Sequence, residues 1–384
     1  MVRKFFIVAA LTCLCIIAVS SFIHQSPRNH RSAATSPSRC STACHNKRDV
    51  LEKFNIALNN HKTISGLYAG DERMFDPHWW SGAPEGYNTF DQFVGHVAER
   101  TGELAGIIEV RFTSHEDERR YGDLDRIVNL LDEKVWQHGA IPAISDFTLN
   151  PWNSEDGRNR DIGEFDDLFT PRTHAYEEFH TELEFIATGL HQLQERGIPV
   201  LFRPFHENTG GWFWWGRRTL NPEEYQRLWH YTFDYLENTE NLDNLIWVYG
   251  ASTSHYELIP ETYPGDDYVH IVGISNYGCN PGRSDVLESY ATLKEVAPNK
   301  PFAFTEVGPE RNGQCREHYN RNLIHTIEND IPDLLYFLNW FGPRAALALY
   351  PEADKVLQHP RIWNADDLSA AGQSRGSTHS QPTE

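Results

Sequence analysis

Short apolar runs alternate with longer amphipathic segments through the middle of the chain. Eight runs are only a few residues long and rich in β-branched and aromatic residues, which is typical of buried strands. The segments between them carry apolar residues at helical spacing. The predicted strands are residues 63–67, 106–110, 141–145, 199–202, 245–248, 269–274, 302–305 and 334–338.

Short motifs predict two helix boundaries between these strands. The helical stretch 173–196 ends at Gly197, a residue type that commonly terminates helices, just before the fourth strand. Asn221 followed by Pro222 is a good helix start between the fourth and fifth strands. Eight strand-then-helix units predict an α/β fold, a single (β/α)8 TIM barrel. An open doubly wound sheet is the alternative, and the lack of a GxGxxG or phosphate-loop motif disfavours it.

The two ends of the chain depart from this pattern. Arg3 and Lys4 precede an apolar run at 5–23, which predicts a signal peptide or, because the run nearly spans a bilayer, a membrane anchor. We therefore expect a secreted protein, or one anchored with its folded domain outside the cell. The predicted organisation is a signal peptide or anchor at 1–23, a flexible linker at 24–46, the barrel domain at 47–368 and a disordered tail at 369–384.

Four cysteines lie beyond the apolar run. In an oxidising compartment an even number of cysteines predicts disulfides, here two. Three pairings are possible, and the one that needs least chain rearrangement joins Cys40 to Cys44 and Cys279 to Cys315. These cysteines lack the paired CxxC spacing of zinc sites, so we do not expect them to bind a metal.

Charge and composition narrow the class of ligand. The 34 Lys+Arg against 54 Asp+Glu give a formal net charge of −20, which would repel nucleic acids and anionic headgroups. A neutral ligand suits such a surface better, and the 12% of aromatic residues supply flat faces on which sugars stack. We expect a polysaccharide as partner, no nucleic acid, membrane contact only through the N-terminal segment, and a monomer.

Two glutamates stand at predicted strand ends. Glu207 follows the fourth strand and Glu306 follows the seventh, and barrel active sites form where strands end. Hydrolysis of a glycosidic bond needs one carboxyl to protonate the leaving oxygen and another to attack or to activate water. One such Glu alone is more often an ion-pair partner, but two at one barrel mouth, each beside aromatic-rich loops, favour catalysis.

Other hydrolytic chemistries fit the sequence less well. No HExxH motif includes the pair His206-Glu207, and His, Cys and Asp are not clustered at metal-ligand spacing. The chain also has no GxSxG motif for a serine nucleophile. We therefore expect neither a metal nor a cofactor in the reaction.

Aromatic residues near the predicted strand ends are candidates for sugar binding. Trp212 lies in a glycine-rich loop after Glu207, where three indoles fall within four positions. Tyr277 ends the sixth strand, where its phenol can donate a hydrogen bond to Glu306. The further candidates are Trp340 after the eighth strand, and Trp152 and the tripeptide His-Trp-Trp at 78–80 for outer subsites.

Two segments resemble glycoside hydrolase family 26, whose main activity is endo-β-1,4-mannanase. Residues 203–208 (RPFHEN) and 212–216 (WFWWG) resemble the acid/base segment of that family. Residues 300–309 (KPFAFTEVGP) resemble its nucleophile segment, and residues 245–277 resemble the stretch between the two. The similarity extends from about Gly197 to Trp363.

The resemblance implies a retaining, double-displacement reaction without a metal, in which Glu207 is the acid/base and Glu306 the nucleophile. Glu207 should then have a raised pKa so that it starts protonated. By the same resemblance, the residues that hold the sugar around the cleavage point are His206, Trp212, Tyr277 and Trp340.

The sequence departs from the mannanase pattern at 145–151, where Phe147 stands in place of a substrate-contacting histidine. Asp146 is the candidate to take over a hydroxyl contact there. The family also contains β-1,3-xylanases and mixed-linkage β-1,3-1,4-glucanases, so these remain alternatives to β-1,4-mannan. An alternative of another class is a non-catalytic glycan-binding protein that keeps the barrel.

Overall fold

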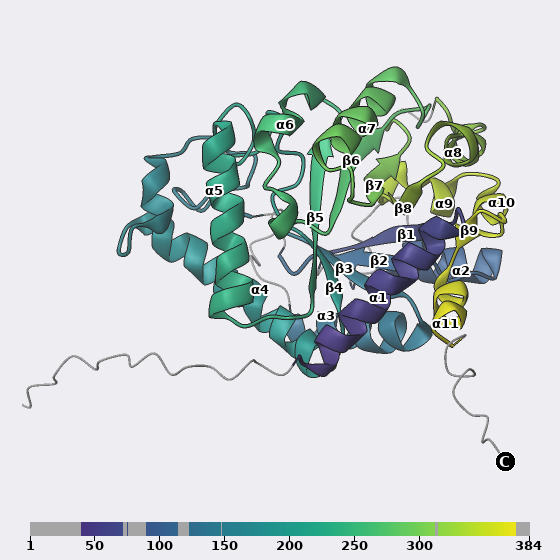
Figure 1. Cartoon of the computed structure of the whole chain (residues 1–384), viewed down its shortest axis with the longest axis horizontal. Helices are drawn as coiled ribbons and strands as arrows, with labels where there is room; N and C mark the ends of the chain where they lie inside the picture. Colours follow the sequence, from purple (N-terminus) through teal and green to yellow (C-terminus); the bar gives the residue numbers. More distant parts are fainter. Residues whose placement is uncertain are drawn as a thin grey trace, which may run out of the picture. The chain divides into compact units, whose positions relative to one another are not determined.

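Eight parallel strands close into a barrel surrounded by helices (Figure 1). The computed structural model describes residues 40–71, 75, 90–113, 123–146, 148–311 and 314–373. Within them the barrel closes because β1 pairs with both β2 and β8. The strands are β1 (Thr63–Gly70), β2 (Ile107–Val110), β3 (Ile141–Ser145), β4 (Val200–Arg203), β5 (Leu245–Ser252), β6 (Ile271–Tyr277), β7 (Phe302–Gly308) and β8 (Leu334–Asn339), with a short β9 (Ile362–Trp363) beside the start of β1.

The helices follow the strands in the order that a (β/α)8 barrel requires. Asn221 and Glu224 form a reciprocal capping box that starts α5 with Pro222 in its first turn, and Gly197 takes a positive φ of 75° beyond the end of α4. The α-helices are α1 (Thr42–Asn59), α2 (His96–Thr101), α3 (Leu124–Leu130), α4 (His174–Glu195), α5 (Pro222–Phe233), α6 (Ile259–Thr262), α7 (Ser284–Val296), α8 (Tyr319–His325), α9 (Ala346–Leu349), α10 (Ala353–Leu357) and α11 (Ala365–Gln373).

The barrel interior forms a core of its own. At least one apolar residue from each of the eight barrel strands packs there with Phe54 and Ala57 of α1. Helix α1 therefore closes the amino-terminal end of the barrel, while a second core fills the space between strands and outer helices. The strand residues of this core include Ile64, Ile107, Ile141, Leu201, Ile246, Ile271, Ala303 and Leu335.

The predicted domain boundaries need correction at both ends. The linker predicted to run to residue 46 is wrong at its end, because α1 begins at Thr42. Ser41 caps this helix by accepting the Cys44 amide at 3.0 Å, and it also binds the Asp243 carboxylate. At the other end, α11 continues past residue 369, because Leu368 is buried against the barrel interior core. Long-range contacts thus order residues whose local composition is polar.

The strands also extend further than the apolar runs predict. Strand β7 continues to Gly308 and β5 to Ser252, so Glu306 lies within a strand instead of after it. Glu306 and Ser252 at these carboxyl ends are buried and hydrogen-bonded, so a search for apolar runs alone underestimates the length of the strands. Among the described residues no helix is long and apolar enough to cross a membrane. The apolar segment at 5–23 lies outside those residues.

The two disulfides join the cysteines that are nearest in sequence. Cys40 bonds to Cys44 at the start of α1, and Cys279 bonds to Cys315 across the loops that follow β6 and β7. This is the pairing that the sequence favours. The second bond links two of the loops that border the barrel mouth.

Candidate active site

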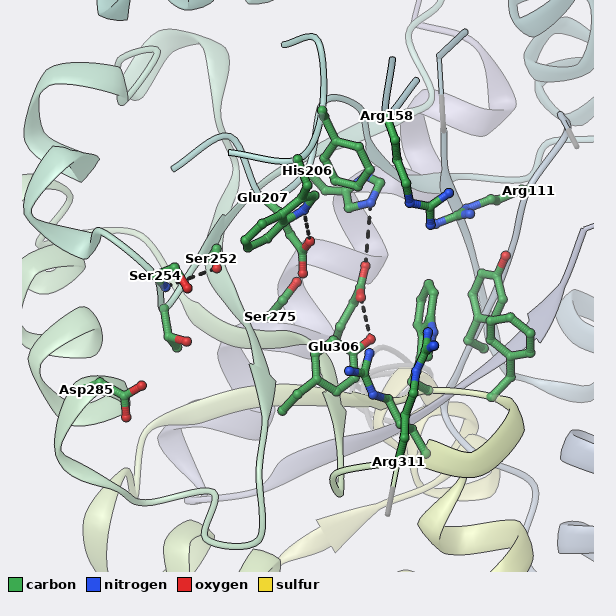
Figure 2. Close-up of a pocket in the computed structure, with 18 of the residues that line it drawn as sticks. Arg111, Arg158, His206, Glu207, Ser252, Ser254, Ser275, Asp285, Glu306 and Arg311 are labelled. Atoms are coloured by element: carbon green, nitrogen blue, oxygen red, sulfur yellow. Dashed lines mark hydrogen bonds and ion pairs between the residues drawn. The ribbon is translucent and has the colours of Figure 1, made fainter. Parts of the chain in front are cut away.

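A cavity of about 620 Å³ opens at the carboxyl ends of the strands. Figure 2 shows Glu207 and Glu306 pointing into it from opposite sides, with His206 beside them. Tyr277, Trp212 and Trp340 line the same cavity. The structure thus brings together six of the candidate residues that lie far apart in the sequence.

Glu306 is held by charged and polar donors on both carboxylate oxygens. The Arg203 guanidinium donates to Oε1 at 2.9 Å, and the Tyr277 hydroxyl donates to Oε2 at 2.5 Å. His206 Nε2 lies 4.0 Å from Oε1. These contacts fix the direction of the carboxylate, because donors to both oxygens remove its freedom to rotate.

A second buried carboxylate shares the same arginine. Arg203 is 1% exposed and also donates to Glu109 of β2 at 2.8 Å. Burial raises the pKa of Glu109, Arg203 lowers it, and the charge of Glu306 raises it further. Burial lowers the pKa of Arg203, but the charges of Glu109 and Glu306 outweigh burial and raise it. One cation on β4 therefore bridges Glu109 of β2 and Glu306 of β7.

This bridge was not predicted from the sequence. Glu109 lies within the predicted strand 106–110 and Arg203 directly follows the predicted strand 199–202, and neither was assigned a role. A signal was present, because an acidic residue within an otherwise apolar strand must find a partner when it is buried. Only the barrel closure shows that the partner lies on β4.

Glu207 occupies a very different environment from Glu306. It follows β4 and is half-buried, and Trp212 Nε1 donates to its Oε2 at 2.8 Å. Burial raises the pKa of Glu207 to about 7, and the charge of Glu306 raises it too, against opposing effects of Ser275, Trp212 and Arg203. At neutral pH this carboxyl therefore holds a proton for much of the time, as a general acid needs.

The backbone at Glu207 adopts an uncommon conformation. Its φ is +57°, in the left-handed region that non-glycine residues seldom adopt, and Phe205 has a φ of +45°. The Glu207 amide donates to the Gly250 carbonyl at 2.6 Å, which ties the turn to β5. Strained residues of this kind cluster at functional sites, where the surrounding structure holds them. The turn directs the Glu207 side chain into the cavity.

Aromatic rings form one wall of the cavity. Trp340 stacks on Tyr68 with ring centroids 4.1 Å apart, and the Arg111 guanidinium lies 5.5 Å from both rings. Trp212 is the large hydrophobic residue with the greatest exposure in the described chain, at 37%. By contrast, the other two indoles of its loop, at positions 214 and 215, are fully buried. One of the three clustered tryptophans is therefore available to a ligand.

Two predicted binding residues lie away from this cavity lining. Asp146 is buried and accepts the Thr113 hydroxyl at 2.9 Å. Trp152 packs edge-on against Trp214 at 5.6 Å and donates its indole N–H to the Glu164 carbonyl. Both residues thus support the third βα loop in this structure. Phe147 and residues 78–80 lie outside the described residues.

The remaining chemistry of the cavity is cationic and polar. Within the described residues, no group of three or more His, Cys, Asp or Glu side chains could hold a metal ion. The cavity lining includes arginines that the sequence analysis did not single out: Arg111, Arg158, Arg283, Arg311 and Arg344. A carboxyl with a raised pKa, Glu207, facing a carboxylate held by donors on both oxygens, Glu306, is an arrangement that suits glycoside hydrolysis.

Comparisons with known proteins agree with this geometry. The chain is 34% identical over 250 residues to a mannan endo-1,4-beta-mannosidase of Bacillus subtilis strain 168, covering 61% of this chain and 66% of that protein. It is 31% identical over 257 residues to mannan endo-1,4-beta-mannosidase A and B of Caldalkalibacillus mannanilyticus, covering 63% and 48%. The matches thus span just under two thirds, or less, of these relatives.

Solved structures and a family model extend the comparison. Bacillus subtilis mannanase man26 superposes with a TM-score of 0.70 at 27% identity, covering 85% of this chain and 94% of that one. This confirms the barrel predicted from the sequence. Residues 81–367 match the model of glycosyl hydrolase family 26, which is most of the chain. The chain therefore belongs to glycosyl hydrolase family 26.

Proposed function

We propose that this chain is a retaining endo-β-1,4-mannanase in which Glu207 is the acid/base and Glu306 the nucleophile. The observation that carries the proposal is the unequal environment of the two carboxyls. Glu207 has a pKa raised to about 7, whereas Glu306 is bound by Arg203 and Tyr277. One carboxyl is therefore ready to give a proton while the other is ready to attack.

The first step transfers the sugar to the protein. Glu207 donates its proton to the glycosidic oxygen as that bond breaks, and a Glu306 oxygen bonds to the anomeric carbon. Glu207 is then a carboxylate, and it removes a proton from water in the second step. The water oxygen bonds to the anomeric carbon, the bond to Glu306 breaks, and both carboxyls return to their starting states.

The substrate assignment rests on the relatives. The curated proteins that match this chain are named for β-1,4-mannan, which favours mannan over β-1,3-xylan or mixed-linkage β-glucan. The exported domain should hydrolyse β-1,4-mannan fastest in a comparison of these three polysaccharides. A higher rate on either alternative would replace the mannan assignment. Tight binding with no cleavage of any of them would instead support a glycan-binding protein.

Substitution of Glu306 tests the retaining mechanism. Glu306→Ala should lower kcat by about 10⁴-fold or more on β-mannan, because no group remains to form the covalent intermediate. Azide should restore part of the activity on an aryl β-mannobioside and yield the α-linked azide product. Chromatography and NMR identify that product. A β-linked azide product, or turnover like that of the wild type, is incompatible with Glu306 as nucleophile.

Glu207→Ala provides the matched comparison. It should slow cleavage of poor leaving groups by roughly 10²- to 10⁴-fold, while substrates with good leaving groups form the intermediate nearly normally. Azide should then yield a β-linked product. If leaving-group acidity makes no difference to the defect, Glu207 is not the acid.

We also propose that the folded domain works outside the cell, as either a secreted or a membrane-anchored protein. Two disulfides support this, since such bonds persist in oxidising compartments. Cell fractionation of the producing organism distinguishes the culture medium, the membrane and the cytosol. Recovery of the intact chain from the cytosol would contradict the proposal.

A further inference from the structure

The cavity is far more cationic than the chain as a whole. The formal net charge is −20, yet five arginines line this one cavity, together with four acidic residues. Two of those four are the reacting glutamates. A surplus of guanidinium groups at a sugar site calls for an explanation, because neutral sugar hydroxyls can be bound by groups that carry no charge.

Two of the five arginines form ion pairs with nearby carboxylates. Arg158 pairs with Asp156 at 3.3 Å, and Arg283 pairs with Asp285 at 2.8 Å. The charges of these arginines are thus offset locally. Arg344 and Arg311 form no ion pair with the described residues.

Arg344 is held in a fixed position without an acidic partner. Its guanidinium carbon lies 3.7 Å from the centre of the Tyr277 ring, and its buried Nε has no hydrogen-bond partner within the described structure. The Arg344 backbone carbonyl accepts the Asn339 side chain at 3.4 Å, and Gly308 packs closely against that carbonyl. A guanidinium over a ring face satisfies none of its N–H donors on a charged acceptor, so these donors remain available to a ligand.

Arg311 adds a second cation to the same cavity. It lies in the loop after β7, is exposed, and has neither a hydrogen bond nor an ion pair to any described residue. Figure 2 shows Arg311 on the Glu306 side of the cavity, away from Arg158 and Arg111. Both unpaired cations therefore come from the loops after β7 and β8.

Glu306 has hydrogen-bond donors on both oxygens without these two cations. Arg203 already donates to Glu306 at 2.9 Å from inside the barrel, and Tyr277 donates to its other oxygen. Arg344 touches the face of Tyr277 instead of the carboxylate. A ligand group is therefore the natural partner for Arg344 and Arg311.

We propose that Arg344 and Arg311 bind an anionic substituent, a carboxylate or a sulfate ester, on a sugar seated beside Tyr277. The inference rests on the proposed function and makes the preferred substrate an acidic β-mannan. Guanidinium groups bind both oxyanions through paired N–H donors, and such charge-assisted bonds are roughly twice as strong as neutral ones. The formal net charge of −20 disfavours non-specific attraction of an acidic polymer, so its binding must come from cationic side chains in the cavity.

The test compares one β-1,4-mannan in three forms: neutral, carboxymethylated and sulfated, matched for chain length and degree of substitution. The wild type should show a kcat/KM ratio of acidic to neutral substrate on the order of tenfold, mainly through KM. The ratio should fall towards unity in about 0.5 M salt, where screening acts within a few ångströms. The form with the higher ratio identifies the anion.

Two variants locate the effect. Arg344→Gln and Arg311→Gln should each lower the ratio several-fold, and Arg344→Lys should keep part of it. The matched control is Arg321→Gln, which removes a surface arginine that pairs with Glu352 at 2.9 Å and should leave the ratio unchanged. Because Arg311 is exposed, its variant is informative even if the Arg344 variant fails to fold.

The outcome separates this inference from the proposed function. If wild-type protein cleaves neutral mannan best, or if both variants keep the acidic preference, the inference is overturned while the mannanase proposal stands. If no form is cleaved, electrophoresis through gels containing each polymer still measures binding. Retardation only by an acidic form, lost in both variants, then supports the anion site without hydrolysis. No selective retardation overturns it.

Discussion

Glu207 and Glu306 are the same residue type in two opposite settings. Burial and the neighbouring charge of Glu306 raise the pKa of Glu207 to about 7. Glu306 instead accepts hydrogen bonds from a buried arginine and a phenol. The direction of proton flow in the proposed reaction thus follows from the partners of each carboxyl: Glu306 accepts from a cation and a phenol, whereas Glu207 accepts from a neutral indole and faces a like charge.

The pH dependence of kcat/KM should report Glu207. Glu207 must be protonated to act first, so activity should fall as pH rises through about 7, the pKa of that carboxyl. Trp212→Phe removes a donor that favours the charged form, so it should move this alkaline limb to higher pH. Initial rates across a pH series locate the alkaline limb in the wild type and in the variant. A shift to lower pH in the variant would contradict this assignment.

Loss of the Tyr277 hydroxyl should lower kcat/KM more than loss of a tyrosine hydroxyl outside the cavity. Tyr277→Phe removes a 2.5 Å hydrogen bond to Glu306, and such a bond to a charged group contributes about 1.5–3 kcal/mol, so kcat/KM should fall roughly 10- to 100-fold. Tyr290→Phe removes a similar bond to Asp333 outside the cavity and is the matched control. Equal effects of the two variants on kcat/KM would show that the Tyr277 bond has only a structural role.

At the scale of elements, the site depends on loops after strands that the barrel aligns. The β6–β7 register places Ser275 beside Glu306, after an irregularity next to Ile274. The Cys279–Cys315 bond then ties the loop after β6 to the loop after β7. Both loops contribute residues to the cavity, so their mutual position bears on substrate binding.

The long-range disulfide should stabilise the fold more than the short one. Loop-closure entropy assigns roughly 4 kcal/mol to the 36-residue separation of Cys279 and Cys315, and roughly 2 kcal/mol to the four-residue separation of Cys40 and Cys44. Double serine variants, compared by urea unfolding, measure the two free energies. The reverse order of stability loss would show that loop closure does not dominate.

Element boundaries illustrate what local sequence can and cannot determine. Asn221, Pro222 and Gly197 act locally, so the helix ends that they mark were predictable. The start of α1 was not, because Ser41 is fixed by Asp243, a residue about 200 positions away. Likewise, the polar carboxyl end of β7 becomes strand only because β6 and β8 flank it.

At the scale of the whole molecule, the raised pKa of Glu207 should lower the free energy of unfolding as pH rises. The folded-state pKa of Glu207 is raised, so the folded protein binds more protons than the unfolded chain between about pH 4.5 and 7. The contribution of Glu207 to stability therefore falls as pH rises through that window. Functional groups of this kind often trade stability for activity.

Glu207→Gln tests this trade-off. The amide keeps an acceptor for Trp212 but cannot ionise, so the variant should have the higher Tm at about pH 8. The advantage should shrink towards about pH 5, where wild-type Glu207 is largely protonated. Calorimetric scans at the two pH values measure the difference. An advantage that grows at the lower pH would contradict the raised pKa.

The net charge of the whole chain does not predict the charge of the cavity. Composition predicts a neutral ligand from the value of −20, because it averages over the whole surface. The cavity gathers five arginines from separate loops, and no linear count reveals that. The local field therefore depends on the fold and not on the composition.

The sequence by itself determined the order of strands and helices, the barrel fold and the choice of two glutamates as candidates, because periodicity, capping residues and short motifs are local properties. Tertiary structure alone decided how those glutamates differ. The Arg203 bridge from Glu109 to Glu306 exists because barrel closure brings three strands within hydrogen-bonding distance. Packing between distant loops also decides that Asp146 lies outside the cavity lining and that Arg344 lies over the Tyr277 ring. Burial and distance, which set pKa and charge, become defined only when the chain folds.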